Sequence, residues 1–170
     1  MFNAFKELIL DKYIHFRLKL FGNITKSIDF PKALRATRNI LIMIPEDSEY
    51  KQEVQEFTAR LYDVFNQAAV STFERKNFRK NDGNWFGLPA DKYLRLFQEA
   101  DIDLIIDLNP KHDKLCAYIA ALSGAPLRMT IGSGAFEYVY NMQLRQDAGK
   151  PLKEKLKNTL NYLKTFTTNA

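Results

Sequence analysis

Apolar residues recur every three or four positions through the first 21 residues, a spacing that predicts one face of an amphipathic helix. Gly22-Asn23 is a suitable end for this helix. Residues 25–38 show no clear period, so we expect them to form a connector. The apolar positions of the predicted helix are Phe2, Phe5, Leu8, Ile9, Tyr13, Phe16 and Leu20.

Later in the chain, short apolar runs predict about five strands. Ile40–Ile44, closed by Pro45, and Ile102–Leu108 have the continuous apolar character of strands covered on both faces. Ala69–Phe73 and Pro126–Ile131 are further strand candidates. Between Phe136 and Leu144 apolar and polar residues alternate, which favours a final strand at a sheet edge and leaves a helix as the alternative.

Helical patterns separate these strands. Their starts are predicted at Asp47 or Ser48, at Asp91, and at Asn109 followed by Pro110, because such side chains cap free backbone N–H groups and proline needs no donor there. Gly124 suits a left-handed helix end. The last helix carries Leu152, Leu156, Leu160 and Leu163. Alternating strands and helices predict a single Rossmann-like α/β domain, a mainly parallel sheet with helices on both faces.

The domain is expected over residues 39–166, after a basic helix and connector (1–38) and before a polar tail (167–170). A length of 170 residues fits one such core. A single cysteine excludes an internal disulfide and a multi-cysteine metal site, and two separated histidines argue against a His-based zinc site. No cofactor is expected. The charged N-terminus does not resemble a secretory signal, and no apolar run would span a bilayer. The cytoplasm is the expected compartment.

In open parallel sheets, ligands bind beyond the carboxyl ends of the strands. Three segments there are candidate ligand-binding sites. Simple helix capping is the competing interpretation for the first two, and a flexible turn for the third. The candidate residues are Asp47 and Ser48, then Asp107, Asn109 and His112, and finally Gly132, Ser133 and Gly134.

Asp107 lies next to Ile106 and Leu108, so its side chain is expected either to face a cleft or to pair with a neighbouring backbone amide. His112 and Asp113 are expected in an exposed first helical turn, although an imidazole near carboxylates is also the material of acid–base catalysis. Cys116 is expected to be a small core residue. No catalytic residue is assigned.

The positive charge is concentrated at the N-terminus. Residues 1–39 hold eight Lys or Arg and three acidic residues, which accounts for the whole net charge of +5. A basic amphipathic helix with aromatic residues can dock on its own domain, bind a partner protein or lie on an anionic membrane; nucleic acid is not expected as a partner. The predicted contact residues are Phe2, Phe5, Lys6, Lys12, Arg17, Lys19, Trp85 and Phe86.

Two resemblances add to this picture. The passage D-I-D-L-I-I-D-L-N to Y-I-A-A-L-S-G-A-P-L-R-M-T-I-G, within Asp101–Gly132, resembles the N-terminal half of bacterial heptosyltransferases, which are GT-B glycosyltransferases. Most of the chain resembles a small bacterial domain family of unknown function. That likeness rests on the basic N-terminal helix, Asn84–Pro89 (N-W-F-G-L-P), the D-L-I-I-D-L strand and Tyr118–Ser123 (Y-I-A-A-L-S).

The first resemblance implies a catalytic base from a Gly-Asp loop near Pro45–Ser48. Only Asp47 could serve as that base here, and the glycine that the family has before the aspartate is missing. The second, nucleotide-sugar-binding half of those enzymes has no counterpart here. We therefore expect a non-catalytic domain that binds a partner protein through its N-terminal helix, with the inner membrane face as one place for that contact. The alternative is a nucleotide- or sugar-binding domain with its ligand at the strand ends. Oligomeric state, pathway and partner identity are not predicted.

Overall fold

The computed structural model describes residues 9, 12–17, 20, 27–46, 48–84, 87–144 and 149–168. Its centre is a five-stranded, wholly parallel sheet in the order β2-β1-β3-β4-β5. This is a doubly wound order, and its switch point lies between β1 and β3. The strands are β1 (Asn39–Ile44), β2 (Ala69–Glu74), β3 (Leu104–Asp107), β4 (Leu127–Thr130) and β5 (Met142–Gln143).

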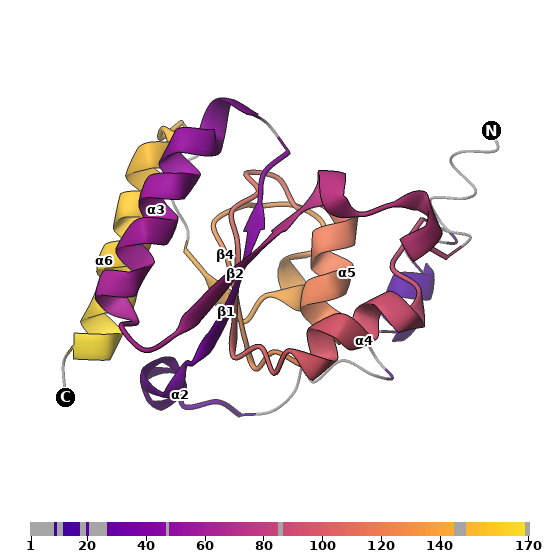
Figure 1. The fold of residues 1–170 in the computed structure, drawn as a ribbon, viewed down its shortest axis with the longest axis horizontal. Helices are drawn as coiled ribbons and strands as arrows, with labels where there is room; N and C mark the ends of the chain where they lie inside the picture. Colours follow the sequence, from indigo (N-terminus) through magenta and orange to yellow (C-terminus); the bar gives the residue numbers. More distant parts are fainter. Residues whose placement is uncertain are drawn as a thin grey trace.

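Helices cover both faces of the sheet, as the α/β prediction required. One layer consists of α2 (Phe30–Ala36), α3 (Lys51–Val64) and α6 (Leu152–Thr168), and the other contains α4 (Asp91–Glu99) and α5 (Lys114–Leu122) (Figure 1). Along β1, Ile40 and Ile42 pack under the first layer, and Leu41 and Met43 under the second. The continuous apolar strands are therefore explained by burial on both faces.

The described part of the N-terminal segment docks on its own domain. Residues 9, 12–17 and 20 are helical. Ile14 is fully buried in the core beside α5, and Tyr13 packs against the same cluster. Arg17 forms a 2.7 Å ion pair with Asp91 at the start of α4. Of the alternatives for this helix, intramolecular docking is thus confirmed for one face.

Residues 25–38 are not a plain connector, because α2 lies within them. Asp29 caps this helix by accepting a hydrogen bond from the Lys32 N–H at 3.1 Å, and Pro31 occupies its first turn. Seven residues make barely two turns, too few to display a helical period. The Asp-Phe-Pro start signal was the cue that could have identified α2.

The predicted final strand over Phe136–Leu144 is mostly wrong. Residues Glu137–Val139 form a 3-10 turn, and only Met142–Gln143 pair with β4. Arg128 holds this crossover against the α5 side of the sheet, since its Nε donates to the Val139 carbonyl at 2.8 Å and its Nη1 to the Ala125 carbonyl at 2.6 Å. The alternation arose from a short crossover that buries Phe136 and Tyr140 and exposes Tyr138.

Three predicted helix starts also need correction. The helix α5 begins after Asp113 rather than Asn109-Pro110, because the Asp113 carboxylate accepts hydrogen bonds from the Leu115 and Cys116 amides at 2.9 and 3.0 Å. Asp91 is the first residue of α4 and pairs with Arg17 instead of capping. The N-cap of α3 is Tyr50, not Ser48, and Asp47 lies outside the described residues.

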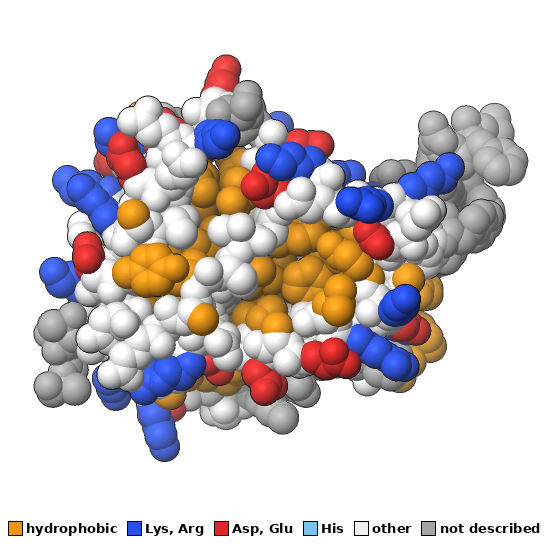
Figure 2. Space-filling model, in the orientation of Figure 1, with side chains coloured by type: hydrophobic (Ala, Val, Ile, Leu, Met, Phe, Trp, Pro, Cys, Tyr) orange, Lys and Arg blue, Asp and Glu red, His pale blue; other side chains and the backbone are white. Residues whose placement is uncertain are grey.

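Other predicted elements are confirmed. The strands β1, β2, β3 and β4 and the helices α3 and α6 lie where the apolar patterns placed them. Gly124 follows α5 with a φ of +88°, the left-handed conformation expected of it. Phe73, Phe78, Tyr93 and Phe97 form a chain of edge-to-face ring contacts between β2 and α4, where Figure 2 shows apolar side chains gathered.

Candidate functional site

The carboxyl ends of the five strands meet at one edge of the sheet, where folds of this order bind ligands. The edge has two unlike halves. The closed half follows β3 and β4 and comprises Asp107, Asn109, His112, Cys116, Thr130, Gly132 and Tyr140. The open half follows β1 and β2 and surrounds a cavity.

Asp107 is the centre of the closed half. Its side chain is fully buried and faces α5. One carboxylate oxygen accepts hydrogen bonds from the backbone N–H and the side-chain amide of Asn109, at 2.9 and 2.7 Å. The other accepts a short hydrogen bond from the Tyr140 hydroxyl. Of the two predictions for Asp107, pairing with a neighbouring amide is therefore confirmed.

Burial controls the protonation of this pair. Removal from water raises the pKa of Asp107 above its ordinary value, and the hydrogen bonds from Tyr140 and Asn109 oppose the rise only in part. Burial and the adjacent carboxylate raise the pKa of Tyr140 well above its ordinary value. Tyr140 thus stays a hydrogen-bond donor, and Asp107 favours its neutral form more than an exposed aspartate does.

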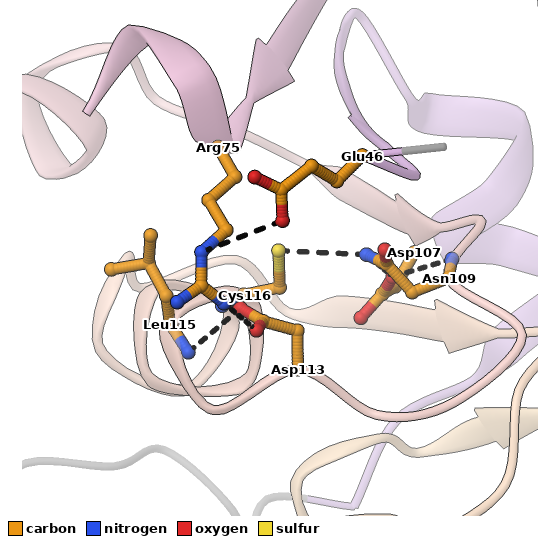
Figure 3. Close-up of polar contacts among 7 residues, drawn as sticks. All are labelled: Glu46, Arg75, Asp107, Asn109, Asp113, Leu115 and Cys116. Carbon is orange, nitrogen blue, oxygen red and sulfur yellow. Dashed lines mark hydrogen bonds and ion pairs between the residues drawn. The ribbon is translucent and has the colours of Figure 1, made fainter. Parts of the chain in front are cut away.

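Cys116 lies beside this pair in the first turn of α5. The second hydrogen of the Asn109 amide points to its sulfur at 3.5 Å, as Figure 3 shows. Cys116 is 2% exposed, and burial, with the nearby Asp107 and Asp113 carboxylates, raises the pKa of its thiol strongly. A thiol with these properties is unreactive, so the core role predicted for Cys116 is confirmed.

His112 is fixed at both ring nitrogens. Its Nδ1 accepts a hydrogen bond from the Phe136 N–H at 3.3 Å, and its Nε2 lies 3.5 Å from the Thr130 hydroxyl. The first contact requires an unprotonated Nδ1, which places the proton of the neutral ring on Nε2. The ring also packs on Tyr140 at 5.1 Å. His112 is half-buried and helps to hold two loops together.

The segment Gly132–Gly134 packs closely on the loop that follows β3. A Cβ at position 132 would lie 2.2 Å from the Asn109 carbonyl oxygen, so only glycine permits this approach. The Gly132 N–H donates to the Thr130 hydroxyl at 3.0 Å, and the Ser133 carbonyl accepts from the His112 N–H at 3.2 Å. The backbone groups of Gly132 and Ser133 therefore help to join the loop after β4 to the loop after β3. A role for this segment in ligand binding stays a prediction.

The open half contains a cavity of about 330 Å³ between the ends of β1 and β2 and the first turn of α3. Ile44, Pro45 and Val54 give it an apolar floor. Charged side chains surround this floor, and the upper part of Figure 2 shows apolar atoms between basic and acidic ones. The charged lining residues are Glu46, Lys51, Glu74, Arg75 and Lys76.

Most of these charges are already paired. Arg75 forms a close ion pair with Asp113 and lies 3.9 Å from Glu46, so it bridges the open half to the cap of α5 (Figure 3). Lys76 pairs closely with Glu74. Lys51 differs, because it contacts no carboxylate of the described residues. Among the described residues that line the cavity, Lys51 is therefore the cation available to a bound anion.

The structure brings Asp107, Asn109, His112 and Gly132–Gly134 together at one edge, as their positions after strands predicted. Lys51, Arg75 and Tyr140 were not among the predicted site residues. The cue for Arg75 was its place directly after β2, whereas Tyr140 lies 33 residues from its partner and no local pattern marks it. Of the remaining predicted residues, Asp47, Phe2, Phe5, Lys6, Lys19, Trp85 and Phe86 lie outside the described part of the chain.

Within the described ranges, no three His, Cys, Asp or Glu side chains converge to form a metal site. The described helices include none with the length and apolar character needed to cross a bilayer.

Comparison with known proteins gave one match. Neither the curated proteins nor the solved structures contain one that matches the chain, so the similarity to heptosyltransferases stays a prediction. A family model, described as "Family of unknown function (DUF6913)", matches residues 12–166, from the N-terminal helix to α6. The chain therefore belongs to this family of unknown function, DUF6913.

Proposed function

We propose that this domain binds a small anionic molecule with an apolar part in the cavity of the open half, and that Lys51 contacts the anionic group. The observation that carries the proposal is a cavity with an apolar floor and an available lysine at the strand ends. A volume of about 330 Å³ is at the lower end of the range for small-molecule sites. It suits a compact carboxylate or phosphate ester, or one part of a nucleotide or sugar phosphate.

The acidic residues near the cavity do not oppose this proposal. Glu74 pairs closely with Lys76, and Glu46 lies 3.9 Å from Arg75, whose closer partner is Asp113, so the charge of Glu74 is offset and that of Glu46 is offset in part. An incoming anion would thus meet Lys51 as the lining cation that has no carboxylate partner among the described residues. Desolvation by Ile44 and Val54 would strengthen that contact, because charges attract more strongly where water is excluded.

The closed half supports a binding role over a catalytic one. Asp107 is fully buried, the Cys116 thiol is shielded, and both His112 nitrogens are engaged. General acid–base catalysis needs a group within hydrogen-bond reach of the substrate. These three groups instead have protein partners, which supports their role as a scaffold for the open half.

Thermal unfolding in the presence of small carboxylates, phosphate esters, nucleotides and nucleotide sugars tests the proposal. A ligand at 100 times its dissociation constant adds about 2.7 kcal/mol to the free energy of unfolding, and about 2–4 °C in Tm per kcal/mol is typical of this chain length. Lys51→Gln should reduce that shift. Lys164→Gln, an exposed lysine near the far end of α6, is the matched control and should leave it unchanged.

A ligand whose shift is the same in the wild type and in Lys51→Gln would contradict the assigned anion contact. A panel in which no compound shifts Tm would contradict the proposed function.

A further inference from the structure

The N-terminal helix has a second apolar face that does not pack on the domain. Ile9, Phe16 and Leu20 are 38%, 61% and 57% exposed. At about 100° per residue, Phe16 and Leu20 lie within roughly 20° of Ile9 around a helix. Three large apolar side chains therefore form one exposed stripe, which we call the outer stripe.

The docked face fixes where the outer stripe points. Ile14 is fully buried in the core and lies about 140° around the helix from Ile9. Arg17 is tied to Asp91 of α4 by its 2.7 Å ion pair. A helix anchored by Ile14 and Arg17 has to present the outer stripe away from the core. No residue of the stripe lines the cavity of the open half, so this surface is independent of the proposed ligand site.

The charge distribution indicates what covers the outer stripe. Residues 1–22 hold four Lys or Arg and two acidic residues, a net charge of +2, and the chain after residue 39 is neutral overall. Lys12 is exposed and lies about 60° around the helix from Ile9, at the border of the stripe. In sequence, Phe2 and Phe5 continue the same spacing, with Lys6 beside them, although these three residues lie outside the described part.

From this we infer that the outer stripe binds the surface of an anionic phospholipid bilayer. Apolar side chains in a row with lysines at the border are the arrangement that lies in a membrane interface, where the rings enter the acyl boundary and the ammonium groups meet lipid phosphates. Each lysine near an anionic surface adds to the attraction. The helix stays docked through Ile14 and Arg17, so the whole domain is held at the membrane.

Cosedimentation with vesicles tests this inference. The wild type should bind vesicles of phosphatidylcholine with phosphatidylserine, bind vesicles of phosphatidylcholine alone much less, and be released by added salt. The double variant Phe16→Ser/Leu20→Ser should lower the partition coefficient about tenfold or more, because two apolar side chains no longer enter the interface. Lys12→Gln should lower it roughly fivefold.

A matched control is Tyr62→Ser/Tyr162→Ser, which removes two exposed aromatic side chains from α3 and α6 and should leave vesicle binding unchanged. Equal binding by wild type and Phe16→Ser/Leu20→Ser, or equal binding to both vesicle types, would overturn the inference. So would a wild-type dimer that this double variant dissociates, because the stripe would then join two copies. Unfolding of the double variant would show that the stripe packs within the domain, and this outcome would also overturn the inference.

Discussion

Both halves of the carboxyl edge have polar side chains after their strands, but the closed half pairs these side chains with one another and the open half leaves a cavity between them. In the closed half, Asp107 and Tyr140 are buried, and together with the partly buried Asn109 they satisfy one another's hydrogen bonds. In the open half, Lys51 and Arg75 surround a cavity that is open to the surface. A polar residue after a strand is thus not by itself a sign of a ligand site.

The difference arises from what covers each pair of strand ends. The crossover after β4 places Tyr140 on Asp107, and the cap of α5 keeps the loop after β3 in place. No described segment covers the ends of β1 and β2 in this way. The closed half provides a rigid wall, and Arg75 joins that wall to the open half through Asp113.

Thiol labelling should give the largest contrast between the halves. Cys116 is the only cysteine of the chain and is buried, whereas Lys51 is exposed at the cavity. In native buffer, Cys116 should react with a disulfide reagent about 10³-fold or more slowly than the thiol of Lys51→Cys/Cys116→Ala, because it reacts only when the structure opens.

Reaction in denaturant, where both thiols are exposed, is the control and should give similar rates. Native rates within about tenfold of each other would mean that the closed half opens readily, and the contrast between the halves would be lost.

Asp107→Asn tests the protonation of the closed half. The oxygen of the new amide can still accept hydrogen bonds from Asn109, and its NH2 group can donate to the Tyr140 hydroxyl. The amide carries no charge. Because the folded pKa of Asp107 is raised, the wild type retains a proton that the unfolded chain releases above about pH 3.9. Relative to the variant, the wild type should lose about 1.4 kcal/mol of stability per pH unit above that value, until the folded carboxyl itself ionises.

Urea unfolding across the acidic and neutral range measures this difference. Asp63→Asn, at an exposed position near the end of α3, should show no such trend. A wild type that gains stability over Asp107→Asn as the pH rises would reverse the sign and show that the hydrogen bonds outweigh burial.

Arg75→Gln should have the smallest effect. The Arg75 side chain is 49% exposed, and exposed ion pairs contribute about 1 kcal/mol or less to stability. The Asp113 cap of α5 remains intact in this variant. Urea unfolding should show a change of that size, close to the change in Arg60→Gln, a control at another exposed arginine. A loss above about 2 kcal/mol would mean that Arg75 holds the two halves together.

Much of this fold could be predicted from local patterns. The strands β1 and β3 are continuous apolar runs, and the helices α3 and α6 show a helical period over three turns or more. The short helix α2 and the two-residue strand β5 have no room for a period. Their presence depends on contacts with distant elements, which a local pattern does not contain.

The site could be predicted in part for the same reason. The interaction of Asp107 with a nearby amide is local, and it is one of the two alternatives that the sequence predicts for this side chain. Asn109 was expected to cap a helix, but its amide is used by Asp107 and Cys116, and Asp113 caps α5 in its place. Two short polar residues within one loop can each take that role. Only the tertiary contacts decide between them.

The position of α6 affects how the chain reaches this structure. Leu156, Leu160 and Leu163 of α6 complete the layer that covers β1, β3 and β4, beside α3 and α2. During translation, at about 5–20 residues per second, all five strands emerge before this helix does. On the ribosome, α2 and α3 can cover their share of this face first, and the share that belongs to α6 stays uncovered until that helix is made.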